Sequence, residues 1–281
     1  MKSQRTKPRE FSFEFFPAKT PAGEEKLRVT WEQLAQLKPK FFSVTFGAGG
    51  STRDRTLGTV LEIQAGGSQA APHLSCIGST REDIAAILDL YKSKGVKHIV
   101  ALRGDLPSGS ADVGELRYAN ELVSFIRERT GSHFHIEVAC YPEFHPQSKN
   151  AQEDLQNFKR KVEAGADSAL TQYFFNADCY LRFVDDCERM GLSLPIVPGI
   201  MPIANFSQLA RFSEACGAEI PRWLRLKMLA YGEDTASQRA LGLDVVTALC
   251  ERLLAEGAPG LHFYTMNQAD LTTELWRRLG L

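Results

Sequence analysis

A short turn after a predicted strand carries the first residues able to do chemistry. Residues 98–102 are apolar enough to form a buried strand, and Arg103, Gly104 and Asp105 follow them directly. Gly104 allows the backbone to turn or to approach a ligand closely, and Pro107 prevents the strand from continuing. Such a turn fits either an ordinary surface ion pair or a binding site. Several other predicted strands also end in polar residues, which favours the binding site.

Glu14 is the residue best suited to proton transfer. It lies in the sequence among Phe13, Phe15 and Phe16. Because burial disfavours a charged carboxylate, we expect the pKa of Glu14 to be raised. A carboxylic acid that is still protonated near neutral pH can act as a general acid. The alternative is a glutamate that pairs with an arginine on another strand.

A predicted helix after residue 150 carries four polar residues at helical spacing. Asp154, Asn157, Arg160 and Lys161 lie on one face of this helix because their separations are close to whole turns. A solvated stripe explains such spacing, and so does a ligand with a ribose and a pyrophosphate. In the second case the cations bind phosphate, and Asp154 and Asn157 bind hydroxyl groups.

The histidines of the chain do not predict a catalytic metal. The first predicted strand lacks the His-x-His pair that a barrel metallohydrolase would place there. The one such pair, His133-Phe134-His135, lies at the start of the fifth predicted strand. That position is at the end of the strand away from the expected site, so we predict no metal.

Segments with strand-like patterns alternate with helix-like segments along the whole chain. About 30 residues per unit and eight units are typical of a (β/α)8 barrel. A doubly wound open sheet is the competing architecture, but the G-x-G-x-x-G turn expected after its first strand is missing. The predicted strands are 11–16, 41–47, 71–77, 98–104, 135–141, 168–175, 196–200 and 261–266. The predicted helices are 23–37, 53–64, 80–95, 115–129, 151–164, 177–190, one from 205, 221–228, 236–255 and 271–279.

These elements predict an α/β fold, a single TIM-type (β/α)8 barrel with extra helices between strands 7 and 8. We find no linker or shift in composition, so one catalytic domain over residues 1–281 is expected, with residues 1–9 as a flexible tail. Alternation along the strands places Val100 and Leu102 toward the helices and Ala101 toward the barrel interior. Sites in such barrels lie at the carboxyl ends of the strands. The inward residues expected there are Glu14, Thr45, His73, Arg103, Asp105, Tyr141, Gln172 and Tyr264.

Composition indicates a globular enzyme without a nucleic-acid or membrane partner. The 281 residues include 33 basic and 34 acidic side chains, for a net charge of −1. This balance gives no basic field for nucleic acid. No run of about 18 apolar residues occurs, so no membrane span is expected. Six cysteines without a C-x-x-C pair are typical of a reduced cytoplasmic protein.

Nine motifs, in order along nearly the whole chain, resemble the bacterial methylenetetrahydrofolate reductases. Any one of them is weakly specific, and together they are highly specific. They are FSFEFFP at 11–17, SVTFGA at 43–48, APHLSC at 71–76, ALRGDLP at 101–107, ACYPEFHP at 139–146, NFKRK at 157–161, TQYFF at 171–175, VPGIMP at 197–202 and HFYTMN at 262–267.

The resemblance implies an enzyme that reduces 5,10-methylenetetrahydrofolate to 5-methyltetrahydrofolate, in one-carbon metabolism and methionine biosynthesis. It implies FAD bound without a Rossmann turn, and a hydride that passes from NADH or NADPH through the flavin to the folate with ping-pong kinetics. A homo-oligomer is expected. Two other functions stay open: a flavin-free folate or pterin methyltransferase, and a folate or flavin carrier without turnover.

The resemblance also implies roles for individual residues. Glu14 is the acid that opens the folate ring, and Asp105 is a carboxylate near flavin and pterin that favours the cationic folate intermediate. Residues that match the substrate positions are Gln172, Phe212 and Tyr264. Residues that match FAD-contacting positions are Thr45, Phe46, Ala48, His73, Arg103, Gly104, Asp105, Tyr118, Ala119, Tyr141, His145, Asp154, Asn157, Arg160 and Lys161.

Three features depart from the family pattern. Gly49-Gly50-Ser51 has a different glycine order, and the loop between Asp105 and Tyr118 is about two residues longer. Gln268 stands where the family has an arginine that could contact the folate tail. The regulatory domain of eukaryotic relatives is not expected here.

Overall fold

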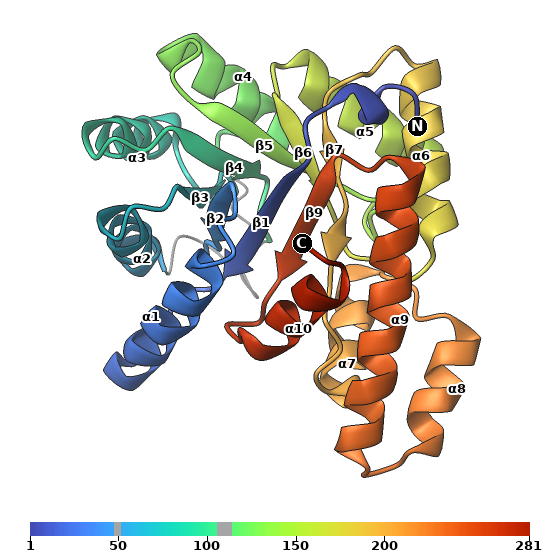
Figure 1. Ribbon diagram of the computed structural model, residues 1–281. Helices are drawn as coiled ribbons and strands as arrows, with labels where there is room; N and C mark the ends of the chain where they lie inside the picture. Colours follow the sequence, from blue (N-terminus) through green and yellow to red (C-terminus); the bar gives the residue numbers. More distant parts are fainter. Residues whose placement is uncertain (48–51, 106–113) are drawn as a thin grey trace. The chain divides into compact units, whose positions relative to one another are not determined.

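The computed structural model describes residues 1–47, 52–105 and 114–281 (Figure 1). These residues form two compact units whose segments interleave along the chain. Unit 1 comprises Met1–Phe11, Cys140–Gln156 and Leu170–Leu281, and unit 2 comprises Ser12–Ala139 and Asn157–Ala169. The organisation as one domain stays a prediction.

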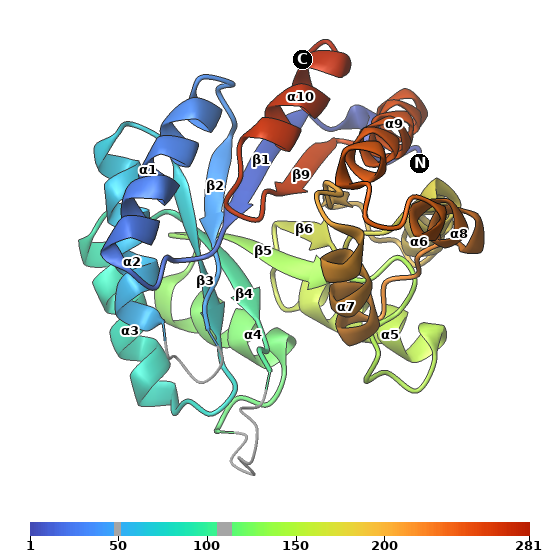
Figure 2. The same ribbon diagram turned by 90° about the horizontal axis from the view of Figure 1, so that it is seen from below.

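Unit 2 is built from parallel strands joined by helices. Its strands β1 to β5 pair in chain order, and Figure 2 shows α1 to α4 side by side along them. Phe13, Phe15 and Phe42 pack together in its core and are fully buried. The elements are β1 (Glu10–Phe15, which begins in unit 1), α1 (Pro21–Ala35), β2 (Phe41–Val44), α2 (Arg53–Ala65), β3 (Ala70–Ser75), α3 (Arg81–Ser93), β4 (His98–Leu102), α4 (Ala119–Thr130) and β5 (His135–Cys140).

Helix starts in unit 2 follow the sequence closely. At α1, the Thr20 side chain accepts a hydrogen bond from the Gly23 amide, and Pro21 is the first helical residue. At α3, Thr80 and Asp83 form a reciprocal capping box. These caps satisfy amide donors that would otherwise lack partners at the first helical turn.

Unit 1 contains the last strands and the helices that follow them. Helix α9 packs against α10 and α6, and Trp276 of α10 contacts Phe11 and Phe263. The remaining elements are the 3-10 helix η1 (Gln4–Thr6), α5 (Ala151–Glu163), β6 (Ser168–Thr171), α6 (Ala177–Arg189), β7 (Ile196–Val197), β8 (Gly199–Ile200), α7 (Phe206–Cys216), α8 (Arg222–Ala230), α9 (Thr235–Glu256), β9 (Gly260–Tyr264) and α10 (Asp270–Arg278). Of these, α5 and β6 each have residues in both units.

The predicted seventh strand is divided by Pro198 into β7 and β8. Proline has no amide proton, so it interrupts the ladder at that residue. In the sheet order, β7 lies next to β6 and β8 lies next to β9. The Gly199 amide donates to Thr171 Oγ1 at 2.8 Å, and the Pro198 carbonyl accepts from the His262 amide at 3.0 Å. Residues 196–200 therefore supply the strand at each end of the sheet order, β7 beside β6 and β8 beside β9.

The fold class is that of a TIM-type barrel, as the sequence predicts. Within the described residues the sheet has nine strands, in the order β7-β6-β5-β4-β3-β2-β1-β9-β8, and the pairs β1–β2, β2–β3, β3–β4, β4–β5 and β8–β9 are parallel. Extra helices α8 and α9 separate β8 from β9, at the predicted place. No helix within the described ranges is both long and apolar enough to span a membrane.

The first residues of the chain, for which the sequence predicts a flexible tail, contact the rest of unit 1. Gln4 is buried, donates to the Leu194 carbonyl at 3.0 Å, and accepts from the Ile196 amide at 2.8 Å. Ser3 donates to Glu188 through both its amide and its hydroxyl group. These bonds hold η1 beside the start of β7.

Candidate functional site

Glu14 lies near the carboxyl end of β1, next to two polar residues of neighbouring strands. The strand register pairs Glu14 with Ser43, and Ser43 with Ala71, two residues before His73. Alternation then places these side chains on one face of the sheet. Glu14 Oε2 accepts from Ser43 Oγ at 3.3 Å and lies 3.2 Å from His73 Nε2, at ion-pair distance but outside hydrogen-bond geometry.

The surroundings of Glu14 shelter the carboxyl from water. Its side chain is 17% exposed, and the side chain of His73 is 9% exposed. The neighbouring Phe13 and Phe15 are fully buried, whereas Phe16 is exposed. The structure thus places an imidazole at ion-pair distance from this carboxyl, and the raised pKa expected for Glu14 stays a prediction.

The register corrects the orientation predicted for β4. His73 pairs with Val100, and Leu74 pairs with Ala101. Val100 and Leu102 therefore share the face of Glu14 and His73, and Ala101 lies on the opposite face. The prediction was wrong because residues 98–102 are apolar at nearly every position, so alternation alone did not distinguish the two faces.

Gly104 fixes the shape of the turn that follows β4. Its φ angle is +86°, in the left-handed region that favours glycine. A Cβ added at this position would lie 1.8 Å from Ser75 Oγ. That hydroxyl donates to the Arg103 carbonyl at 2.8 Å, which ties the end of β3 to the turn. Asp105 follows as an exposed residue.

The turn is also joined to the start of α4. Cys76 Sγ is within 3.8 Å of the Tyr118 carbonyl oxygen, and burial raises the pKa of this thiol to about 12. Cys76 is therefore a neutral packing residue and not a nucleophile. Tyr118 is exposed at the helix start, and Ala119 is the first residue of α4.

The residues after β2 are described as far as Gly47. The Thr45 amide donates to the Phe15 carbonyl at 2.9 Å, and the Thr45 carbonyl accepts from Thr56 Oγ1 at 2.8 Å. Phe46 is half-buried. Ala48, the remaining family position of this loop, lies outside the described residues, as do Gly49, Gly50 and Ser51 of the altered glycine order.

In unit 1, Asp154 organises the loop between β5 and α5. Its Oδ2 accepts from the His145 amide and its Oδ1 accepts from Ser148 Oγ, both at 3.0 Å. The imidazole of His145 packs edge-on against Tyr141, with ring centroids 4.6 Å apart. Asp154 therefore has a structural task in the loop, which its spacing in the sequence did not reveal.

The later residues of α5 lie in unit 2 and carry the positive charge predicted for this helix. Arg160 is exposed and its Nη1 donates to Asn157 Oδ1 at 2.6 Å. Lys161 Nζ donates to the Ala139 carbonyl at 2.5 Å and lies over the Phe158 ring. The helix thus presents cations next to the end of β5.

Two predicted substrate residues lie at strand ends in unit 1. Gln172 directly follows β6, and its Oε1 accepts from the Tyr173 amide at 3.0 Å. Tyr264 ends β9, and its hydroxyl group donates to the Thr171 carbonyl at 2.7 Å. This hydrogen bond joins the two strand ends and brings Tyr264 next to the residue that precedes Gln172.

Phe212 is 40% exposed on α7 and is therefore not a core residue of that helix. Its neighbour Ser213 is buried, and the Ser213 hydroxyl lies 3.0 Å from the Tyr173 hydroxyl. This contact fixes α7 against the segment that carries Gln172. Gln268 is exposed, and its amide donates to the Thr265 carbonyl at 3.0 Å.

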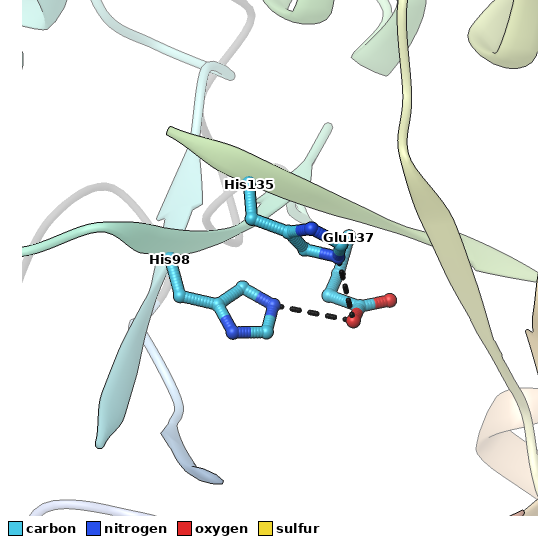
Figure 3. A group of neighbouring side chains, drawn as sticks. All are labelled: His98, His135 and Glu137. Carbon is cyan, nitrogen blue, oxygen red and sulfur yellow. Dashed lines mark hydrogen bonds and ion pairs between the residues drawn. The ribbon is translucent and has the colours of Figure 1, made fainter. Parts of the chain in front are cut away.

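One group of chemically capable residues was missed from the sequence (Figure 3). His98 and His135 are the first residues of β4 and β5, and both contact the carboxylate of Glu137. Burial disfavours the charged form of Glu137, but hydrogen bonds and charge from the two imidazoles outweigh it, so the pKa of Glu137 is lowered. The signal was available, because His135 and Glu137 are two residues apart on one strand face.

Comparison with known proteins identifies the family. The sequence model described as methylenetetrahydrofolate reductase matches residues 1–280. The chain belongs to the methylenetetrahydrofolate reductase family. The 5,10-methylenetetrahydrofolate reductases of Salmonella typhimurium and Escherichia coli are each 42% identical to it over 271 residues, which covers 96% of this chain and 90% of each relative.

A solved structure supports the fold. An uncharacterised protein from Clostridium thermocellum, which binds two copies of 5-methyl-5,6,7,8-tetrahydrofolic acid, matches with a TM-score of 0.67. The match covers 99% of this chain and 97% of that protein at 14% sequence identity. At this identity the likeness concerns the fold alone.

Proposed function

We propose that this chain reduces 5,10-methylenetetrahydrofolate to 5-methyltetrahydrofolate, with NADH or NADPH as the electron source, FAD as the resident cofactor and ping-pong order. The observation that carries the proposal is the family match over residues 1–280. The placement of Glu14 and the identity to bacterial reductases support it. We also predict a cytoplasmic homo-oligomer.

Glu14 is the proposed general acid. Its carboxyl is mostly sheltered and is held by Ser43 and His73, so its orientation is fixed before substrate binds. In this role it gives its proton to the folate nitrogen that leaves when the five-membered ring opens. A positioned general acid typically contributes about 10²–10⁴-fold to the rate. His73 holds the carboxyl in place and is a positioning residue for this step.

Asp105 is the proposed partner of the positive charge that ring opening creates on the folate. A carboxylate stabilises a nearby cation and disfavours additional negative charge. Gly104 directly precedes Asp105 and has a positive φ angle, which glycine adopts without strain.

The donor set fits a dinucleotide cofactor. Arg160 and Lys161 suit a pyrophosphate, and the side-chain amide of Asn157 on the same face of α5 suits a ribose. Arg103 adds a third cation in unit 2. When bound, FAD would supply hydride transfer between the nicotinamide and the one-carbon unit of the folate. The residues proposed to hold it are Thr45, Phe46, Ala48, His73, Arg103, Gly104, Asp105, Tyr118, Ala119, Tyr141, His145, Asp154, Asn157, Arg160 and Lys161.

Unit 1 supplies the proposed substrate contacts. Gln172 offers an amide at a strand end, and Phe212 offers an exposed ring on which a planar pterin or nicotinamide can stack. Tyr264 braces the strand end beside Gln172. Gln268 is a neutral residue for the folate tail, so we predict a weaker tail contact than an arginine would make.

The decisive experiment separates the two half-reactions of the Glu14→Gln variant by anaerobic stopped-flow absorbance at the flavin band. We expect bleaching by NADH at the unmodified rate, and reoxidation by methylenetetrahydrofolate slowed by about 10²-fold or more. Unchanged reoxidation would refute the acid assignment. A wild-type protein that binds no FAD would refute the flavin mechanism and favour a methyltransferase. Flavin and folate binding without turnover would indicate a carrier.

A further inference from the structure

The carboxylate of Glu137 is the centre of a buried group that the proposed reaction does not use. Glu137 is 3% exposed and His98 is 7% exposed, whereas the side chain of His135 is 47% exposed. Glu137 Oε1 lies 3.2 Å from His98 Nε2 and 3.5 Å from His135 Nε2. The other carboxylate oxygen, Oε2, is buried and has no hydrogen-bond partner among the described residues.

We propose that His98, His135 and Glu137 form a binding site for a divalent transition-metal ion, and that the bound ion is Zn²⁺. One ligand atom from each residue can be chosen so that all three lie within 4.8 Å of one another. Zinc bonds of about 2.0–2.1 Å in tetrahedral geometry separate neighbouring ligand atoms by about 3.3 Å. The two distances from Glu137 Oε1 are already close to that separation.

The donor types select the class of metal. Two imidazoles and one carboxylate suit zinc and its neighbours in the first transition row, whereas Mg²⁺ and Ca²⁺ prefer oxygen ligands alone. An ion would also change the electrostatics around the buried carboxylate. It would replace the imidazole contacts that compensate the buried carboxylate in this structure, and it would bring a positive charge close to Oε2, which has no hydrogen-bond partner among the described residues.

The neighbours of the site are arranged as an outer shell. Asp167 Oδ2 lies 4.0 Å from His135 Nδ1, the nitrogen on the far side of the ring from the metal position. Arg127 Nη2 and the Ile136 amide hold the same oxygen at 2.5 Å and 2.7 Å. A fixed carboxylate behind a ligating histidine is a common outer-shell arrangement. Ser168 Oγ is hydrogen-bonded to His135 Nε2 at 2.6 Å, and an ion bound to this nitrogen would displace that hydrogen bond.

The proposed ion is structural and not catalytic. Its ligands stand at the first residues of β4 and β5 and on β5 itself, so the ion would join the starts of two adjacent strands. The half-exposed ring of His135 provides the path by which an ion enters. The site is independent of the proposed reductase reaction.

The test is a Zn²⁺ titration of purified protein stripped of metal with a chelator and then freed of the chelator. His133 offers a matched control, because its ring belongs to the same His-x-His pair but contacts Lys97 Nζ and the Val96 carbonyl instead. We expect one equivalent of zinc for the wild type and for His133→Ala. In His135→Ala we expect affinity lower by about 100-fold or more, beyond the loss typical of an outer-shell change.

Two further readouts make the result decisive. Saturating Zn²⁺ is expected to raise the thermal midpoint of the wild type and of His133→Ala, and to leave that of His135→Ala unchanged, because only binding to the native state stabilises it. Co²⁺ is expected to give the visible absorption of a four-coordinate ion when it is added to the wild type, and no such absorption when it is added to His135→Ala. No stoichiometric zinc binding by the wild type, or equal affinity in His135→Ala, would overturn the proposal. A buried ion pair between carboxylate and imidazole would then be the only role of the group.

Discussion

Substitution of Gly104 by alanine tests whether the turn after β4 depends on glycine for two separate reasons. The first reason is the backbone, because φ at Gly104 is +86°. The second is space, because the added Cβ would lie 1.8 Å from Ser75 Oγ and 2.9 Å from Ser75 Cβ. The Ser75 hydroxyl would have to move, and its hydrogen bond to the Arg103 carbonyl would be lost.

The two effects can be given separate magnitudes. An L-residue in the left-handed region costs about 1–2 kcal/mol. Overpacking typically costs a further 1–3 kcal/mol or so, and the lost hydrogen bond about 1 kcal/mol. We therefore expect Gly104→Ala to lower the free energy of unfolding by about 3–6 kcal/mol. Gly95 has φ of +75°, and no described atom lies within 4 Å of a Cβ added there, so Gly95→Ala is expected to cost only about 1–2 kcal/mol.

Urea unfolding followed by tryptophan fluorescence measures both variants against the wild type. The Ser75→Gly change in the Gly104→Ala background removes the close atoms, and we expect the double-mutant cycle to show a favourable coupling of about 1–2 kcal/mol. Equal losses of stability in Gly104→Ala and Gly95→Ala would refute the argument from space. Zero coupling with Ser75→Gly would locate the overlap elsewhere.

Two further predictions concern unit 1. Burial opposes ionisation of Glu188, but hydrogen bonds from Ser3 and from the amino terminus outweigh burial and lower the pKa of Glu188. The ionised carboxylate therefore stabilises the fold above the ordinary glutamate pKa, and this stabilisation is lost as the pH falls through the lowered pKa. Glu188→Gln is thus expected to destabilise the protein by about 1 kcal/mol at pH 7 and by progressively less below about pH 4, and a pH-independent difference in urea midpoints would contradict this. Phe212→Ala removes an exposed ring, and we expect it to raise the KM for folate and for nicotinamide several-fold with little change in thermal stability. A large drop in the thermal midpoint would instead indicate that Phe212 packs in the core.

The order of strands and helices could be predicted because local signals agree with the tertiary structure. Apolar runs, glycines after helices and prolines after strands gave nearly every element within a few residues of its observed bounds. The sixth strand was the main exception. It was expected to extend to Phe175 but ends at Thr171, although Tyr173, Phe174 and Phe175 remain buried. The residues after the strand end are still buried, so the hydrophobic pattern continues beyond the last hydrogen-bonded residue of the strand.

Face assignments could be predicted only where one face of a strand is polar. In β1, Glu14 alternates with Phe13 and Phe15, and the structure confirms that the two phenylalanines are buried in the core. In β4 both faces are apolar, and the register with β3 was needed to find that Val100 lies beside His73. Contacts of Gln4 were likewise hidden, because a polar side chain with two buried backbone partners leaves no hydrophobic signal.

The same rule shows how the group around Glu137 could have been found. In β5, His135 and Glu137 alternate with the buried Ile136 and Val138, as clearly as Glu14 alternates with its phenylalanines. The register pairs His98 with His135 and Val100 with Glu137, and it pairs Val100 with His73. Glu137 therefore lies on the same sheet face as the proposed acid.

Two carboxylates on one face, each beside an imidazole, differ in access. The Glu14 side chain is 17% exposed near the carboxyl end of β1, whereas the Glu137 side chain is 5% exposed near the start of β5. Position along the strand, and not residue type, distinguishes the carboxylate that we propose as the general acid from the one that we propose as an ion ligand.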